Sequence, residues 1–197
     1  MRLVLASASP IRSTLLSRAG VPHEALPARV DEAAIRAALE AEGAGPRDMA
    51  DALAEAKARK MSEKFPEAMV IGCDQVLALD HEVLAKPETP AEAEAQLRRL
   101  RGRRHALMSA AVIYHDRQPQ WRHVGIAHLT MRDFSDAYLS GYLARNRESV
   151  RESVGAYKLE EEGVRLFARV EGEYFTVLGL PLIDILSYLS LRGVIEG

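Results

Sequence analysis

Residues 68–79 read AMVIGCDQVLAL, an apolar run that holds a single charged residue, Asp74. A run this apolar belongs in the interior, so any fold of the chain has to bury it. Its length and its residue types favour extended structure. We predict one strand, a break around Gly72-Cys73-Asp74, and then a second strand.

Helical and extended patterns alternate along the rest of the chain. Capping and glycine signals predict helices at residues 11–19, 31–42, 47–65, 89–100, 135–145 and 181–193. Further strands are expected at residues 2–6, 82–85, 105–114 and 121–132, and a last hairpin at 164–170 and 173–177. This order predicts an α/β fold with a mixed, twisted sheet and flanking helices, organised as a single domain over residues 1–197.

The composition excludes several classes of protein. The 197 residues are 48% hydrophobic and 27% charged, as is ordinary for a globular protein, and the net charge of −2 gives no general attraction to nucleic acid or a membrane. The single cysteine, Cys73, cannot form an intrachain disulfide and is expected in a buried strand. Because no apolar stretch is long enough for a membrane span or a secretory signal, we expect a cytoplasmic protein.

The first candidate site is the segment Ser7-Ala8-Ser9-Pro10 with Arg12. A strand is expected to end here and a helix to begin, so free backbone N–H groups and the helix dipole would favour an anion. The hydroxyls and the guanidinium would complete a phosphate site. A plain helix start, with Ser9 as the cap and Arg12 in solvent, fits the same residues.

Asp74 is the second candidate, because an unpaired charge inside an apolar run is costly. It could bind a divalent metal or act as a general base on water. The alternative is a turn aspartate at a corner of the sheet after Gly72. The long apolar flanks favour the functional interpretation.

Three further charged positions each have a structural alternative. Lys86, stiffened by Pro87, could neutralise a phosphate or be an ordinary surface lysine. The pair Asp31-Glu32 at a helix start could supply a second carboxylate for a metal or simply complement the helix dipole. Lys57, within AEAKARK, could act in a site or belong to a solvated helix face.

Residues 155–163, GAYKLEEEG, combine an aromatic residue with a dense acidic run between glycines. An aromatic ring can stack on a base, and a carboxylate accepts hydrogen bonds from guanine N–H groups, so the segment is a candidate for base recognition. A charged surface loop is the alternative. The chain contains no Walker loop, GxGxxG, HExxH or Ser-His-Asp signature.

Seven stretches resemble the Maf family of nucleoside triphosphate pyrophosphatases, in family order and over nearly the whole chain: LASASPIRSTLL, PARVDE, LAEAKA, VIGCDQVLAL, LAKPETPAEAEAQLRRLRGRRH, GAYKLEEEG and VLGLPL. The resemblance implies two lobes around a nucleotide cleft. It also implies hydrolysis of a nucleoside triphosphate to the monophosphate and pyrophosphate, with a divalent metal such as magnesium or manganese.

The resemblance also implies roles for individual residues. Asp74 would be the base that acts on water, and Asp74 and Glu32 would serve the metal. Lys57 and Lys86 would neutralise the triphosphate. The phosphates would be held by three residues near the N-terminus: Ser7, Ser9 and Arg12. Ile11 stands where the family often has a second arginine, which leaves Arg12 without that partner.

Within the family, the pair Asp74-Gln75 with Lys158 and Glu160 resembles the branch that prefers 7-methyl-GTP. The resemblance implies that Gln75, Lys158 and Glu160 contact the substrate. A carboxylate suits the N–H edge of guanine, and an acidic loop favours a base made cationic by methylation. Ser109-Ala110 departs from the Thr-Gly often found in the family and bears on substrate choice.

Two alternative functions remain open at this point. One is a dTTP/UTP pyrophosphatase of the same family, and the other is a non-catalytic nucleotide-binding regulator of cell division. The acids Asp74 and Glu32 favour catalysis, because a binding module needs only the basic residues. The apolar residues 182–191 are expected in the core, with a homodimer surface as the alternative.

Overall fold

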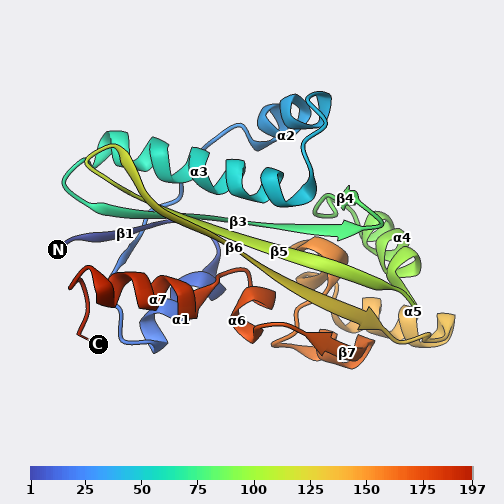
Figure 1. The fold of residues 1–197 in the computed structure, drawn as a ribbon. Helices are drawn as coiled ribbons and strands as arrows, with labels where there is room; N and C mark the ends of the chain where they lie inside the picture. The colour runs from blue at the N-terminus through green and yellow to red at the C-terminus, as the bar shows by residue number, and fades with distance from the viewer. Residues whose placement is uncertain (197) are drawn as a thin grey trace.

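The computed structural model describes residues 1–196 and contains a seven-stranded mixed sheet with helices on both faces (Figure 1). The strand order is β2-β1-β3-β5-β6-β7, and β4 also pairs with β3. The mixed α/β sheet with flanking helices is therefore confirmed. The strands are β1 (Leu3–Ala6), β2 (Glu24–Ala25), β3 (Met69–Leu79), β4 (Glu82–Leu84), β5 (Arg104–His115), β6 (Gln118–Met131) and β7 (Phe167–Glu171).

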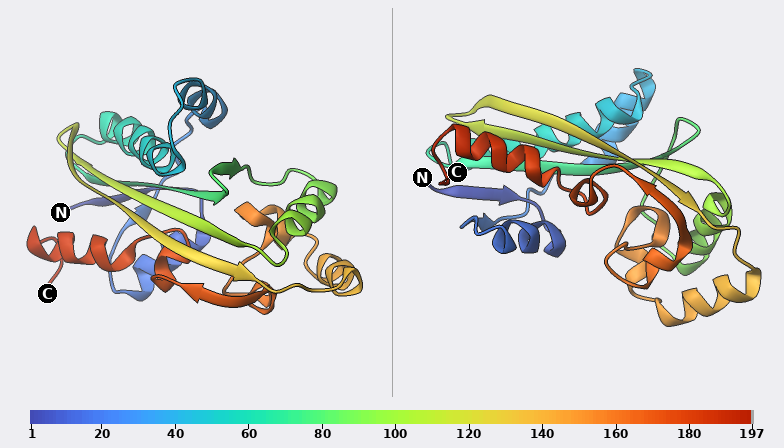
Figure 2. Two further views of the ribbon diagram at one scale, coloured as in Figure 1. Left: turned by 45° about the vertical axis from the view of Figure 1, so that its right-hand side comes forward. Right: turned by 60° about the horizontal axis from the view of Figure 1, so that its bottom comes forward.

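The helices cover the sheet in two layers. In Figure 1, α3 lies along one face, and α1 and α7 lie along the other. The two termini lie at one end of the sheet, and α4 and α5 lie at the other (Figure 2). The helices are α1 (Pro10–Arg18), α2 (Glu32–Ala41), α3 (Pro46–Lys64), α4 (Pro90–Leu100), α5 (Asp136–Arg145), α6 (Tyr174–Val177) and α7 (Leu182–Leu191), with short 3-10 helices at Ser149–Arg151, Val154–Ala156 and Glu162–Leu166.

The alternation of side chains along β1 and β3 explains why helices cover both faces of the sheet. Val4 and Ala6 pack with Leu53 of α3, whereas Leu3 and Leu5 pack with the side chains of α1 and α7. Successive side chains of a strand point to opposite faces, so strands with apolar residues on both faces need cover on both. On β3, this alternation turns Asp74 toward α3.

The predicted break in residues 68–79 is wrong, because β3 runs unbroken from Met69 to Leu79. Gly72, Cys73 and Asp74 pair in register with β5. Gly72 serves packing and not a turn: a Cβ there would come within 2.2 Å of the Ala54 carbonyl oxygen on α3. The backbone of α3 therefore lies directly on β3, next to Asp74. Cys73 is fully buried, as predicted.

The predicted last hairpin is also wrong. Residues 162–166 form a 3-10 helix, β7 pairs with β6, and Tyr174–Val177 forms the short helix α6. The β-rich composition of YFTV suggests a strand, but tertiary contacts override this preference. The helical turn aims the carbonyl oxygens of Thr176 and Val177 at a side chain of β3.

The edge of β3 is open at its centre. Pairing with β1 uses residues 69–72, and pairing with β4 uses residues 77–79, while β5 occupies the opposite edge. Among the described residues, positions 73–76 therefore have no strand partner on the β1 side, and Asp74 and Gln75 can be reached from that edge. Among the described residues, no helix combines the length and the apolar character that a membrane span requires.

Candidate active site

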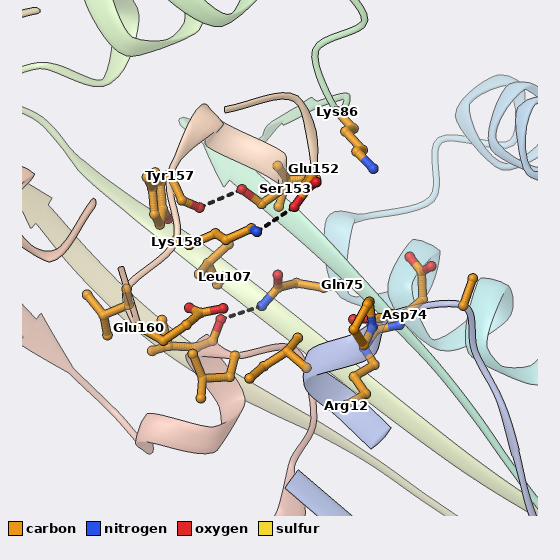
Figure 3. A pocket seen from close by; sticks show the side chains of 18 of the residues that line it. Arg12, Asp74, Gln75, Lys86, Leu107, Glu152, Ser153, Tyr157, Lys158 and Glu160 are labelled. Atoms are coloured by element: carbon orange, nitrogen blue, oxygen red, sulfur yellow. Dashed lines mark hydrogen bonds and ion pairs between the residues drawn. The ribbon is translucent and has the colours of Figure 1, made fainter. Parts of the chain in front are cut away.

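A cavity of about 770 Å³ opens at this gap (Figure 3). Its volume is in the range of small-molecule sites. The structure brings together here ten of the residues singled out by sequence. Eight line the cavity, namely Ser9, Arg12, Glu32, Asp74, Gln75, Lys86, Lys158 and Glu160. The other two are bonded to lining residues: Ser7 to Arg12, and Lys57 to Asp74.

Lys57 joins two carboxylates at one end of the cavity. Its Nζ donates to Asp74 Oδ1 at 2.7 Å and lies 2.8 Å from Glu32 Oε1. Lys57 and Asp74 are buried, so the interpretation of Lys57 as part of a solvated face is wrong. Burial alone would lower the pKa of Lys57, but attraction by Asp74 and Glu32 outweighs it and the pKa is raised. The ammonium group is therefore protonated at neutral pH.

Asp74 has one oxygen in use and one free. Oδ2 is buried and has no hydrogen-bond partner among the described residues. Arg36 faces this oxygen, with its Nη2 3.5 Å from Oδ2. A buried oxygen without a partner is costly unless a ligand, a water or an ion completes it. The turn-aspartate alternative is wrong, because Asp74 lies within a continuous strand.

The N-terminal segment forms a second wall. Ser9 occupies the N-cap position of α1, but its side chain makes no capping hydrogen bond. The backbone N–H of Ser9 donates to Ser7 Oγ at 3.2 Å. The start of α1 therefore faces the cavity with its helix dipole and with a Ser9 hydroxyl that is not used as a cap.

Arg12 is an internal anchor. Its Nε donates to the Gly179 carbonyl at 2.8 Å, and its Nη1 donates to the Cys73 carbonyl at 3.1 Å and to Ser7 Oγ at 3.3 Å. The side chain thus occupies the open edge of β3 and ties it to the segment after α6. Since Nε and Nη1 are engaged, Nη2 is the part of this guanidinium left for an anion.

Gln75 is anchored in a similar way. Its Nε2 lies 3.0 Å from Ser109 Oγ, 3.2 Å from the Thr176 carbonyl and 3.0 Å from the Val177 carbonyl, and it is drawn at the centre of Figure 3. Ser109 also donates to the Thr176 carbonyl, at 2.7 Å. These backbone acceptors have no sequence signal, so pattern reasoning missed them.

The 155–163 segment lies at the other end of the cavity, and its acids are divided. Glu161 pairs with Lys158, and Glu162 pairs with Arg145. Glu160 is exposed, lines the cavity and has no ion-pair partner in the described part of the chain. Glu160 is therefore the acid of this run that is free to meet a ligand.

Tyr157 is not free to stack on a base from a loop. Its ring is buried against Phe167, and its hydroxyl lies 2.7 Å from His105 Nε2. Burial raises its pKa well above the ordinary value. The ring instead anchors the segment from which Lys158 and Glu160 project.

The residues present fit a divalent cation of the magnesium type. No group of three or more His, Cys, Asp or Glu side chains within residues 1–196 is arranged to hold a metal by itself. Glu32 and Asp74 converge on Lys57, so their two carboxylate groups lie close together and offer oxygen ligands. Magnesium characteristically takes one or two carboxylates and completes its shell with substrate phosphates and water.

The fold and the site together define a class: a mixed α/β protein with an acid–lysine cluster and a helix N-terminus at an open strand edge. The chain belongs to the Maf family, because the model for "Maf-like protein" matches residues 2–191.

Curated relatives match over almost their whole length. A "Nucleoside triphosphate pyrophosphatase" of Ruegeria sp. (strain TM1040) is 60% identical over 98% of each chain. One of the same name from Roseobacter denitrificans is 60% identical over 97% of this chain and 96% of the relative. A "7-methyl-GTP pyrophosphatase" of Rhizobium meliloti is 49% identical over 98% of each.

Proposed function

We propose that this chain is a nucleoside triphosphate pyrophosphatase that cleaves its substrate between the α- and β-phosphates. The products are a nucleoside monophosphate and pyrophosphate. The names of relatives that are 58–60% identical over 97–98% of the chain support this activity. The observation that carries the proposal is the Asp74–Lys57–Glu32 cluster, which opens onto a cavity of ligand size.

The hydrolysis needs a base that acts on water. Water attacks the α-phosphorus, and the bond from that atom to the bridging oxygen breaks, so the electron pair leaves with pyrophosphate. Asp74 takes the proton of the water at Oδ2, its unpartnered oxygen. Lys57 donates to Oδ1 and holds the carboxylate in one orientation.

The triphosphate also needs positive charge. Lys86 is exposed on the cavity wall and has no carboxylate partner among residues 1–196, so its ammonium group is free for a phosphate. The N-terminus of α1 offers backbone N–H groups to the phosphates, and Arg12 on the same helix offers its Nη2. Glu32 and Asp74 would hold a divalent metal, which when bound neutralises phosphate charge and polarises the phosphate oxygens.

For the base we propose 7-methylguanine, so that the preferred substrate is 7-methyl-GTP. Relatives named 7-methyl-GTP pyrophosphatase, 46–49% identical, support this choice. The free carboxylate of Glu160 can accept hydrogen bonds from the N1–H and N2–H₂ groups of guanine, and its charge favours a cationic base. Lys158 is held by Glu152 and Glu161 and orders this wall of the cavity.

The test is pyrophosphate release across a panel of nucleoside triphosphates that includes 7-methyl-GTP, GTP, dTTP and UTP, each with magnesium and with manganese. We expect 7-methyl-GTP to have the highest kcat/KM. Preference for dTTP or UTP would contradict the base assignment alone. Silence across the panel with intact binding would support a non-catalytic nucleotide-binding protein.

A variant separates catalysis from binding. Asp74→Asn keeps the shape of the side chain but removes the proton acceptor, so hydrolysis is expected to fall by about 10²–10⁴-fold. Binding of a non-hydrolysable triphosphate analogue should persist, as measured by calorimetry. Near-normal turnover by this variant would rule out Asp74 as the base.

A further inference from the structure

Arg36 is a cation of the cavity wall that sequence reasoning did not single out. It lies on α2, one turn after Glu32, so the two side chains share a face of the helix. Its Nη2 lies 3.5 Å from Asp74 Oδ2, and its side chain is 23% exposed. The Asp74 carboxylate is thus contacted from two sides. Arg36 faces it from the cavity wall, and Lys57 holds it from the interior.

The donors of Arg36 are weakly used in the free protein. Its Nη1 approaches Met49 Sδ at 3.6 Å, and a thioether is a weak acceptor. The 3.5 Å separation from Asp74 Oδ2 is too long for a good hydrogen bond. Arg12, in contrast, donates to two backbone carbonyls. Within the described residues, Arg36 therefore has more free N–H donors than Arg12.

Most cations of the site already have carboxylate partners before a ligand binds. Lys57 and Arg36 face Asp74 and Glu32, and Lys158 is paired with Glu152 and Glu161. A triphosphate adds several negative charges, so besides the exposed Lys86 it also needs cations that can change partners. A partly exposed arginine on the cavity wall can do this, whereas the buried Lys57 cannot leave two carboxylates.

We propose that Arg36 is a further catalytic residue, whose guanidinium contacts a non-bridging oxygen of the bound triphosphate. A planar guanidinium offers two parallel N–H donors to a phosphate. This contact draws Arg36 away from Asp74 Oδ2, so that oxygen is free for the attacking water. The inference rests on the proposed pyrophosphatase function and adds a residue to it.

The competing interpretation is that Arg36 only docks α2. This helix has no fully buried residue, and Ile35 and Leu39 pack partly buried against the α3 side. The ion pairs from Glu32 to Lys57 and from Arg36 to Asp74 also hold it. A docking role would be shared by any cation at position 36, and its loss would affect every ligand of the cavity.

The test compares Arg36→Ala, Arg36→Lys and the control Arg47→Ala. Arg47 is an exposed arginine in the first turn of the neighbouring α3 and does not line the cavity. The measurements are kcat and KM for the best substrate, the Kd of an α,β-methylene triphosphate analogue, the inhibition constant of the matching nucleoside, and Tm.

We expect Arg36→Ala to lower kcat and to raise the Kd of the triphosphate analogue by about 10- to 100-fold, the range for a lost hydrogen bond to a charged group. The inhibition constant of the nucleoside should stay within about twofold of the wild-type value, because a nucleoside has no phosphate for Arg36 to contact. Arg36→Lys should recover Tm but only part of kcat, and Arg47→Ala should match the wild type.

Two outcomes would overturn the inference. One is an Arg36→Ala variant with wild-type kcat and analogue binding. The other is equal weakening of analogue and nucleoside together with a lowered Tm, which is the signature of docking alone. Turnover by the wild type is measured separately. If the wild type is active but the role of Arg36 is disproved, the proposed function still stands. A wild type without turnover overturns both.

Discussion

Lys57 Nζ lies 2.7 Å from Asp74 Oδ1, in a pair that joins the middle of α3 to the middle of β3 inside the protein. The pair exists because the backbone of α3 rests on Gly72, two residues before Asp74. A buried carboxylate that accepts a hydrogen bond from a buried lysine is held in one orientation. The same contact therefore joins the core to the proposed chemistry.

Lys57→Met is expected to lower the free energy of unfolding by about 3 kcal/mol, because it leaves Asp74 buried without its hydrogen-bonded cation. Urea denaturation measures the loss. The double variant Lys57→Met/Asp74→Leu removes both charges and should be more stable than Lys57→Met alone. A double variant that is less stable than the single one would contradict the buried-pair argument.

Gly72→Ala should destabilise the protein by about 3 kcal/mol or more, because its Cβ would overlap the α3 backbone. Gly141→Ala is the matched control, and we expect it to raise stability instead of lowering it. It lies inside α5, where the nearest atom is the end of the flexible Arg145 side chain, so a gain of about 0.5–1 kcal/mol is expected. Chemical denaturation of both variants checks the pair, and similar effects would contradict it.

Arg12→Lys tests the anchoring role of Arg12. Lysine keeps the positive charge but cannot donate to the Gly179 and Cys73 carbonyls together, so we expect a loss of about 2 kcal/mol in unfolding free energy. Arg18→Lys, at an exposed site on the same helix, should change it by less than about 0.5 kcal/mol. Equal stability of the two variants would assign Arg12 to anion binding alone.

His105 predicts a pH dependence of stability. Burial lowers its pKa to about 4, while an unfolded chain titrates near the ordinary value of 6.5. Between these values the unfolded state binds more protons, so stability falls as the pH drops from 6.5 toward 4, by up to about 3 kcal/mol.

The measurement is the free energy of unfolding at several pH values in that window. His105→Gln removes the titrating group and should flatten the slope. Tyr157→Phe removes only the hydroxyl partner and should keep it, because burial is the cause of the shift. A wild-type slope in His105→Gln would contradict this assignment.

Local pattern predicted most elements well. The capping residues Asp31, Thr89 and Ser135 each accept a hydrogen bond from the backbone N–H three residues later, and helices begin after them. Such signals act over a few residues, so they can be recognised without tertiary information. The mixed sheet followed from the alternation of these elements along the chain.

The errors arose where distant residues decide. Gly72 has the local signature of a turn, yet it lies inside a strand because α3 passes over it. Tyr174–Val177 has strand-forming residues, yet it turns helically toward Gln75 on β3. In both cases a contact with a segment distant in sequence outweighs the local preference.

The residue pattern alone specified the α/β class, the family resemblance and the ten residues that gather at the cavity. Only the folded chain decided how these residues are used. Lys57 bridges two acids from the interior, Arg12 is bound to the carbonyl of Gly179, 167 residues away, and Arg36 faces Asp74. The reason is that burial, ion pairing and hydrogen-bond satisfaction depend on neighbours in space, which residue spacing does not record.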